Sequence, residues 1–112
     1  VVAAWRAGYR IFDCTLPPRH GRHGRLNVFR GPATVAAVTG PSFYDTLDLS
    51  DERFVRDAAP PEPGCDCACC KRYTRAYLHH LLAVGDATGA GLASIHNLRF
   101  FARFFELLGA AA

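Results

Sequence analysis

Four of the chain's five cysteines stand within six consecutive positions, in the stretch GCDCACC that spans residues 64–70. Disulfide bonds among these four would be strained, because neighbouring thiols rarely reach the dihedral angle that a disulfide prefers, and Cys14 cannot pair with them all. Thiolates gathered in a tight turn are instead typical zinc ligands. The cluster therefore predicts a metal site, around which the flanking segments must fold.

The spacing of the cysteines selects three of them as ligands. A structural zinc ion takes four ligands in a tetrahedron at about 2.0 to 2.3 Å. Cys65, Cys67 and Cys70 form a C-x-C-x-x-C turn, which can present three sulfur atoms to one ion. Cys69 directly precedes Cys70, and two adjacent side chains rarely reach one ion without backbone strain. We therefore expect Cys69 to be a spare thiol.

Three histidines after the turn, His79, His80 and His96, are candidates for the fourth ligand. The first two lie within three turns of Cys70 on the helix that is predicted to follow it, where folding back over the turn is difficult. His96 comes after a glycine-rich bend and can return to the cysteine loop, which would attach the C-terminal helix to the preceding strands. We predict a structural zinc ion held by the three cysteines and His96, with no open position for chemistry.

The composition is that of one globular domain at most, with 112 residues of which half are apolar. No apolar run approaches the roughly 20 residues that span a bilayer, and Arg6 comes too early for the core of a signal peptide, so we expect a cytoplasmic protein with no membrane partner. The net charge of +3 is mild, yet seven of the 13 basic residues fall in residues 19–30 and 71–75. The sequence contains no methionine, and we interpret it as a piece of a longer protein.

The first 24 residues predict a helix end, a strand and a loop. Residues 1–7 have the pattern of the last turns of a helix ended by Gly8, and residues 9–12 that of a short buried strand, as in a helix that feeds a parallel strand. Residues 13–24 are expected to form a loop, because two prolines and two glycines fall within eight positions. Cys14 is expected to be a small buried apolar residue without chemistry.

The middle of the chain predicts a small β-meander, because apolar residues alternate from position 26 to position 49. The turns are expected at the Gly-Pro dipeptides of residues 31–32 and 40–41, with residues 34–38 as the middle strand.

After the cysteines the apolar spacing becomes helical, and residues 77–82 place four apolar side chains on one face. Gly85, Gly89 and Gly91 are expected to weaken or break that helix. A second helix is predicted from Ser94, a plausible N-cap, with apolar residues at positions 101, 104, 105 and 108.

Four motifs together resemble one known family. They are FDC-x-LP-x-R-x-x-R-x-G at residues 12–24, CDC-x-x-C at 65–70, YTRAYLHHL at 73–81 and IHNLRF at 95–100. The chain resembles, over nearly its whole length, the C-terminal part of tRNA-guanine transglycosylase, the queuine tRNA-ribosyltransferase family.

The resemblance implies an α/β fold, namely the C-terminal part of a TIM-type (β/α)8 barrel with an inserted zinc-binding β subdomain and C-terminal helices. Residues 1–24 would hold the last helix turn, the final barrel strand and the catalytic loop. Residues 25–72 would form the zinc subdomain, and residues 73–112 the C-terminal helices.

The resemblance also implies a function: exchange of guanine at the anticodon wobble position of tRNA for a deazaguanine, through a covalent intermediate. The family's nucleophile falls on Asp13, and its zinc ligands fall on Cys65, Cys67, Cys70 and His96. Its tRNA contacts fall on Pro18, Arg19, His20, Gly21 and Arg22. Its homodimer contacts fall on Tyr73, Tyr77 and His80.

The chemistry agrees with these assignments. A carboxylate at the C-terminal end of a barrel strand sits where such barrels react, and Asp13 would attack the ribose anomeric carbon through an oxocarbenium-like transition state. Arg19 and Arg22 can neutralise phosphates or stack on splayed bases.

This sequence departs from the family pattern at several points. Pro18 stands where the family usually has a hydroxyl residue, and His23 where it often has Asn. The span from Asp13 to Cys65 is longer than usual by about a dozen residues, which we place as an extra hairpin near residues 30–45. The base pocket and a second catalytic aspartate belong to earlier barrel strands, so we expect this chain alone not to catalyse. The alternatives are a stand-alone zinc-binding RNA module and a dimerisation piece.

Overall fold

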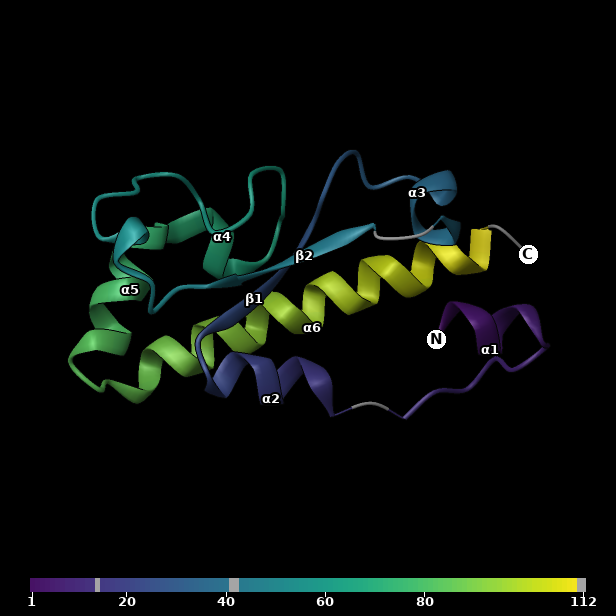
Figure 1. Cartoon of the computed structure of the whole chain (residues 1–112), viewed down its shortest axis with the longest axis horizontal. Helices are drawn as coiled ribbons and strands as arrows, with labels where there is room; N and C mark the ends of the chain where they lie inside the picture. The colour runs from purple at the N-terminus through teal and green to yellow at the C-terminus, as the bar shows by residue number, and fades with distance from the viewer. Residues whose placement is uncertain (14, 41–42, 111–112) are drawn as a thin grey trace.

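The computed structural model describes residues 1–13, 15–40 and 43–110. Its central element is α6 (Ala87–Ala110), a helix of 24 residues that runs along most of the molecule in Figure 1. A hairpin of β1 (Arg25–Phe29) and β2 (Tyr44–Asp48) lies along one side of α6, and α2 (Leu16–Arg22) lies along another. The remaining helices are α1 (Val2–Arg6), α3 (Val35–Thr39), η1 (Glu52–Phe54), α4 (Ala68–Arg72) and α5 (Arg75–Ala83).

The hairpin confirms two of the three strands predicted for the meander. The strands are antiparallel, with Leu26 opposite Leu47, and the alternation of the sequence places Leu26 and Val28 in the core. The middle strand predicted over residues 34–38 is wrong, because this segment forms α3. Thr34 caps α3 by accepting a hydrogen bond from the amide of Ala37 at 3.1 Å.

The predictions for the first 24 residues are partly corrected. The helix end is confirmed as α1, but residues 9–12 form no strand, and Ile11 is 94% exposed. A buried strand needs hydrogen-bonding neighbours, and the described part of the chain offers none to this segment. The loop predicted over residues 13–24 contains α2, because both prolines fall at its first positions, where a helix needs no N–H donor. Cys14 lies outside the described residues.

The C-terminal helices begin and end differently from the prediction. Gly85 follows α5 with a φ of +74°, a conformation that suits glycine. α6 begins at Ala87 rather than at the predicted Ser94. At this start the Asp86 carboxylate accepts the amide N–H of Thr88 at 2.8 Å. Gly89 therefore lies inside α6 and does not break it. It is buried against α5, where an added Cβ would lie 3.0 Å from that of Leu81.

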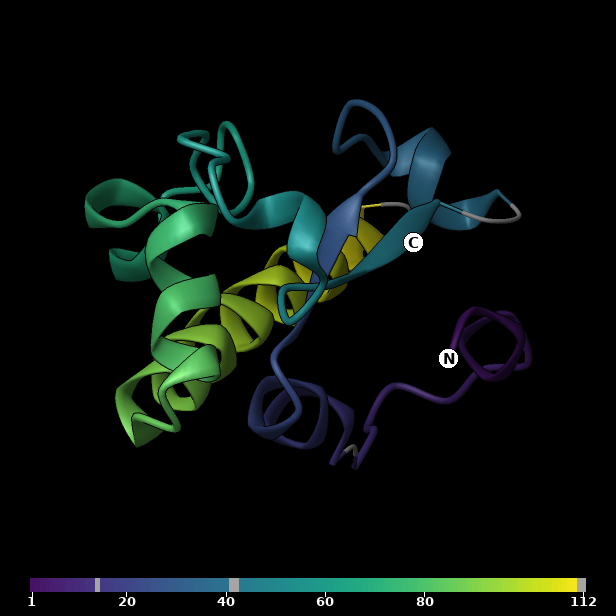
Figure 2. The ribbon, with the colours of Figure 1, turned by 60° about the vertical axis from the view of Figure 1, so that its left-hand side comes forward.

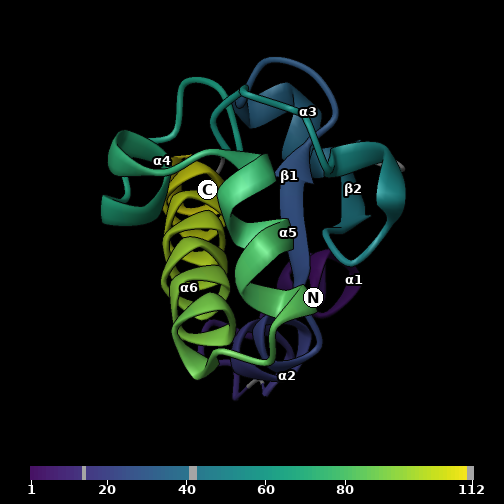
Figure 3. The ribbon, with the colours of Figure 1, turned by 90° about the vertical axis from the view of Figure 1, so that its left-hand side faces the viewer.

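Two apolar clusters make up the core of the described residues. One joins the hairpin, the cysteine loop and α5. α5 packs beside α6, as Figure 3 shows. The other surrounds Phe104 near the end of α6, with Val38 and Leu108. Figure 2 shows α2 beside α6, at the start of β1.

The sheet described here has two strands, so these residues show a small α/β unit and not the expected barrel. None of the described helices combines the length and the apolar character needed to cross a membrane.

Candidate metal centre

The four predicted zinc ligands come together from three segments. Cys65 lies in the loop before α4, Cys67 caps that helix, Cys70 lies within it, and His96 lies on α6. Their ligand atoms all fall within 4.8 Å of one another. His96 Nδ1 is 3.6, 3.7 and 3.2 Å from the sulfur atoms of Cys65, Cys67 and Cys70. A tetrahedral zinc ion holds nitrogen and sulfur ligands about 3.5 Å apart, so the site has the size that the ion needs.

The hydrogen bond of His96 Nε2 leaves Nδ1 as the nitrogen that can bind the ion. Nε2 lies 2.7 Å from the carbonyl oxygen of Asn27, and because a carbonyl can only accept, Nε2 carries the proton. The lone pair of the neutral ring is then on Nδ1, which faces the three sulfur atoms. Hydrogen bonds of this kind orient metal-binding histidines. The side chain of His96 is fully buried, which closes the site to solvent.

The backbone around the cysteine turn is arranged for these ligands. Gly64 has a φ of +86°, which turns the chain into the loop ahead of Cys65. Cys67 has extended backbone angles, and its sulfur accepts the amide N–H of Cys70 at 3.3 Å. The backbone of the turn thereby helps to fix the position of the Cys67 sulfur.

The thiols differ in their proton affinity. A hydrogen bond from the Cys70 thiol lowers the pKa of Cys65 to about 3 against the opposing effect of burial. The same hydrogen bond, together with burial, raises the pKa of Cys70. Burial raises the pKa of Cys69 to about 12, so this thiol stays neutral and behaves as a small apolar residue. Three sulfurs and one imidazole, all buried, are the donor set of a structural zinc site.

Glu62 is a member of the site that the sequence did not reveal. Its carboxylate is 7% exposed, and Oε2 accepts the amide N–H of Phe29 at 2.6 Å. Oε1 lies 3.8 Å from His96 Nε2 and 3.7 Å from the Arg103 guanidinium. Burial raises the pKa of this carboxyl group. The available signal was an acid in a proline-rich segment three residues before a metal ligand.

The other two histidines are not among the ligands that the described structure gathers. His79 is buried, and its Nδ1 lies 2.8 Å from the carbonyl oxygen of Leu49, so it ties α5 to the end of β2. His80, the next residue of α5, is exposed. The rings of Tyr73 and Tyr77, which precede it in the chain, stack with centroids 5.2 Å apart.

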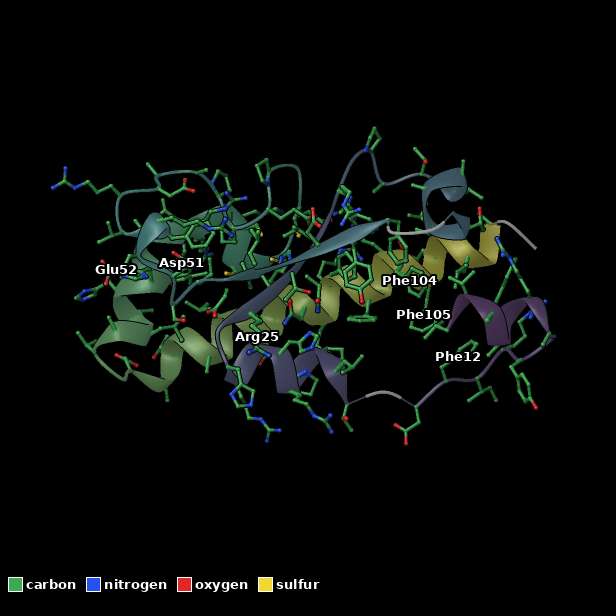
Figure 4. All side chains as sticks on the ribbon, viewed as in Figure 1. Phe12, Arg25, Asp51, Glu52, Phe104 and Phe105 are labelled. Carbon is green, nitrogen blue, oxygen red and sulfur yellow. The ribbon has the colours of Figure 1, made fainter. Side chains whose placement is uncertain are left out.

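The predicted nucleophile lies away from the metal centre. Asp13 is exposed in the irregular segment between α1 and α2. The residue before it, Phe12, stacks on Phe105 of α6 with ring centroids 5.6 Å apart (Figure 4). This contact places the segment against the far end of the helix that carries His96.

The predicted tRNA contacts all lie on α2 but are not equally accessible. Pro18, Arg19 and Arg22 are exposed. His20 is half-buried, with Nδ1 3.2 Å from the side-chain oxygen of Asn27. Gly21 is buried against α6 and has no side chain to offer.

Comparison with known proteins agrees with the geometry. The family model described as Queuine tRNA-ribosyltransferase matches residues 1–111. Proteins named queuine tRNA-ribosyltransferase from Symbiobacterium thermophilum, Nitrosomonas eutropha and Thiobacillus denitrificans are 40%, 39% and 38% identical over 99%, 95% and 99% of this chain. The matched regions are 24%, 26% and 26% of those proteins, so the chain spans about a quarter of their length. The chain belongs to the queuine tRNA-ribosyltransferase family.

Proposed function

We propose that this chain supplies the nucleophile, part of the tRNA-binding surface and the zinc centre of a tRNA-guanine transglycosylase. Such an enzyme exchanges the guanine at the wobble position of tRNA for a deazaguanine. The observation that carries the proposal is the closed three-cysteine, one-histidine site in a chain that the family match covers almost completely. Zinc, when bound, supplies structure rather than chemistry, because its four protein ligands leave no free position.

Asp13 is proposed as the nucleophile. Its carboxylate oxygen forms a bond to C1′ of the wobble ribose, while the bond from C1′ to N9 of guanine breaks and its electron pair leaves with the base, which takes up a proton. The incoming deazaguanine then loses the proton from its own ring nitrogen and attacks C1′. The ester bond breaks, and the carboxylate of Asp13 is restored. The exposure of Asp13 supports this role, because a polynucleotide must reach it.

α2 is proposed to contact the anticodon loop. Arg19 and Arg22 are exposed on α2, and guanidinium groups can neutralise phosphates or stack on unpaired bases. Pro18 and His20 lie between or beside these arginines, and the fifth family position, Gly21, lies on the buried side of the same helix.

The remaining family features are also proposals for this chain. A homodimer would use the stacked pair of Tyr73 and Tyr77 together with the exposed His80. The pocket for the base is expected in barrel strands outside this sequence, so the isolated chain should bind RNA without exchanging guanine. A cytoplasmic location stays a prediction.

The test is a chimaera in which residues 1–111 replace the matching segment of the Thiobacillus denitrificans relative. We expect it to incorporate radiolabelled guanine into tRNA and to form a covalent adduct with tRNA. Asp13→Ala should abolish both, while Asp51→Ala, a change at another exposed aspartate, should leave both in place. An adduct that persists in Asp13→Ala would remove Asp13 from the mechanism.

The isolated zinc-loaded chain distinguishes the alternatives. Salt-sensitive binding of tRNA without exchange, combined with an inactive chimaera, would favour the stand-alone RNA module. Self-association with neither binding nor exchange would favour a dimerisation piece.

A further inference from the structure

Asn97 is buried on α6, and its amide group bonds both ends of the segment that carries α2. Nδ2 donates one hydrogen bond to the carbonyl oxygen of Pro17 at 3.2 Å and another to that of Arg25 at 2.9 Å. Oδ1 accepts the amide N–H of Asn27 at 2.9 Å. Because two partners are carbonyls and the third is an N–H, only this orientation of the amide satisfies all three. Pro17 lies in the first turn of α2, and Arg25, which is labelled in Figure 4, begins β1.

A second contact fixes the distance between α2 and α6. A Cβ added to Gly21 would lie 2.2 Å from Ser94 Oγ and 2.7 Å from both the Cα and the nitrogen of Ser94. α2 therefore touches the backbone of α6, and any larger residue would push the helices apart. Ser94 precedes Asn97 by three residues, so both contacts lie on one face of α6.

This docking leaves the basic side chains of α2 facing solvent. Pro17 and Gly21, four positions apart, face α6 and are buried, whereas Arg19 and Arg22 are exposed. The two arginines thus lie on a helix whose distance from α6 and whose orientation are set by its contacts with α6.

The docking is also tied to the metal centre. His96 and Asn97 are consecutive, and they bind the carbonyl oxygen and the amide nitrogen of the same residue, Asn27. The same helical turn of α6 therefore holds a zinc ligand and α2.

We infer that Asn97 is a positioning residue for tRNA recognition: it holds α2 against α6, through Pro17 and Arg25, in the place from which Arg19 and Arg22 meet the anticodon loop. The inference rests on the proposed function, which assigns RNA contact to α2. It predicts that the position of α2 can be disturbed while the zinc site stays intact.

The test compares the zinc-loaded 112-residue chain with its Asn97→Asp variant. The aspartate keeps an oxygen for the amide of Asn27 but places a second oxygen against the two carbonyls. The N–H groups of Arg19 and His23 bond to the carbonyl oxygens of Thr15 and His20 at the two ends of α2. We expect their hydrogen exchange to accelerate about tenfold, with zinc content and exchange in α5 unchanged. Affinity for a synthetic anticodon stem-loop RNA with guanine at the wobble position should fall about tenfold.

Two further variants control this result. Leu98→Asp adds the same charge one position away, at a side chain that is 57% exposed, and should change neither the exchange of α2 nor the RNA affinity by more than about twofold. Gly21→Ala disturbs the other contact and replaces none of the residues of the metal site. It should accelerate exchange in α2 with zinc retained, even if Asn97→Asp fails to fold.

Unchanged exchange in α2 in Gly21→Ala and in a folded Asn97→Asp variant would overturn the inference. So would an equal loss of RNA affinity in Leu98→Asp, because charge alone would then explain it. Faster exchange with unaltered affinity would overturn the link to recognition. If the wild-type chain binds no stem-loop RNA, the proposed RNA contact of α2 fails, and the exchange data still decide whether Asn97 holds α2.

Discussion

His96 donates a hydrogen bond from Nε2 to the carbonyl oxygen of Asn27 at 2.7 Å, and this bond joins the metal centre to the hairpin. It orients the ring and leaves Nδ1 free to bind the ion. Because Asn27 lies in the middle of β1, the site links strand, cysteine loop and C-terminal helix. Loss of this hydrogen bond should therefore reduce both the stability of the fold and the affinity for the metal.

Replacement of His96 by alanine should weaken zinc binding by roughly 100-fold. Structural zinc contributes about 10–16 kcal/mol through four ligands, so one ligand corresponds to about 3 kcal/mol. Competition with a chromophoric chelator measures the affinity. His80→Ala is the matched control, because His80 is exposed, and it should retain wild-type affinity. Equal zinc affinity in His96→Ala and the wild type would remove His96 from the ligand set.

Cys69 and Cys70 are adjacent, but their replacement by alanine should have opposite consequences. Cys70→Ala removes a sulfur that lies 3.2 Å from His96 Nδ1, so the stoichiometric zinc should be lost. Cys69→Ala deletes one buried atom outside the ligand set and should retain one zinc per chain, at a cost of about 1 kcal/mol in the free energy of unfolding. Metal analysis after gel filtration distinguishes the two variants. A zinc-free Cys69→Ala protein would contradict the ligand set.

Alanine at Gly89 and at Gly91 should shift stability in opposite directions. At Gly89 the new Cβ would lie 3.0 Å from that of Leu81, so α5 and α6 must separate, and we expect a loss of about 1 kcal/mol. At Gly91 nothing lies within 4 Å, so the higher helix propensity of alanine should raise the free energy of unfolding by about 0.5–1 kcal/mol. Urea unfolding of the zinc-loaded proteins measures both. A stabilised Gly89→Ala variant would show that the two helices are not in close contact.

The Asp57 carboxylate should make stability depend on pH in the acidic range. The amide of Ala59, followed by the Arg75 guanidinium at 3.2 Å, lowers the pKa of Asp57 in the folded chain. Its contribution is thus complete above the unfolded pKa of about 3.9 and is lost as the pH falls through the folded value. Asp57→Asn should lower the free energy of unfolding at pH 7. Between about pH 5 and pH 2 the variant should lose less of this free energy than the wild type does. Parallel profiles of the two proteins would exclude this contribution.

The sequence predicted well which four residues come together at the metal centre, because three of them lie within one turn of chain whose spacing is itself the signal. His96 followed from which histidine could return to that turn. Asn27 and Glu62 were missed because their roles arise from contacts across 69 and 33 positions, to His96 and to Phe29. Such partners are set by the packing of α6 against the hairpin, which no local pattern contains.

The errors in secondary structure have physical causes. Residues 34–38 alternate like a strand, but the cap at Thr34 and the apolar contact of Val38 with the end of α6 favour a helix. Residues 17–24 contain two prolines and two glycines, which usually break helices. Prolines at the first positions of a helix, however, do not break it. Residues 9–12 have the composition of a buried strand, but composition cannot supply the neighbouring strands that such a segment needs.

The continuity of α6 limits where this chain can vary in length. Its first half closes the metal site and packs against α2, and its second half carries Phe104 and Leu108 of the second apolar cluster. A deletion within α6 would therefore rotate one set of partners away from the other by about 100° per residue. Added residues can be accommodated only where the chain departs from this rod, as between β1 and β2, where α3 already occupies the connection. Natural length differences among relatives should therefore collect in that connection and spare the helix.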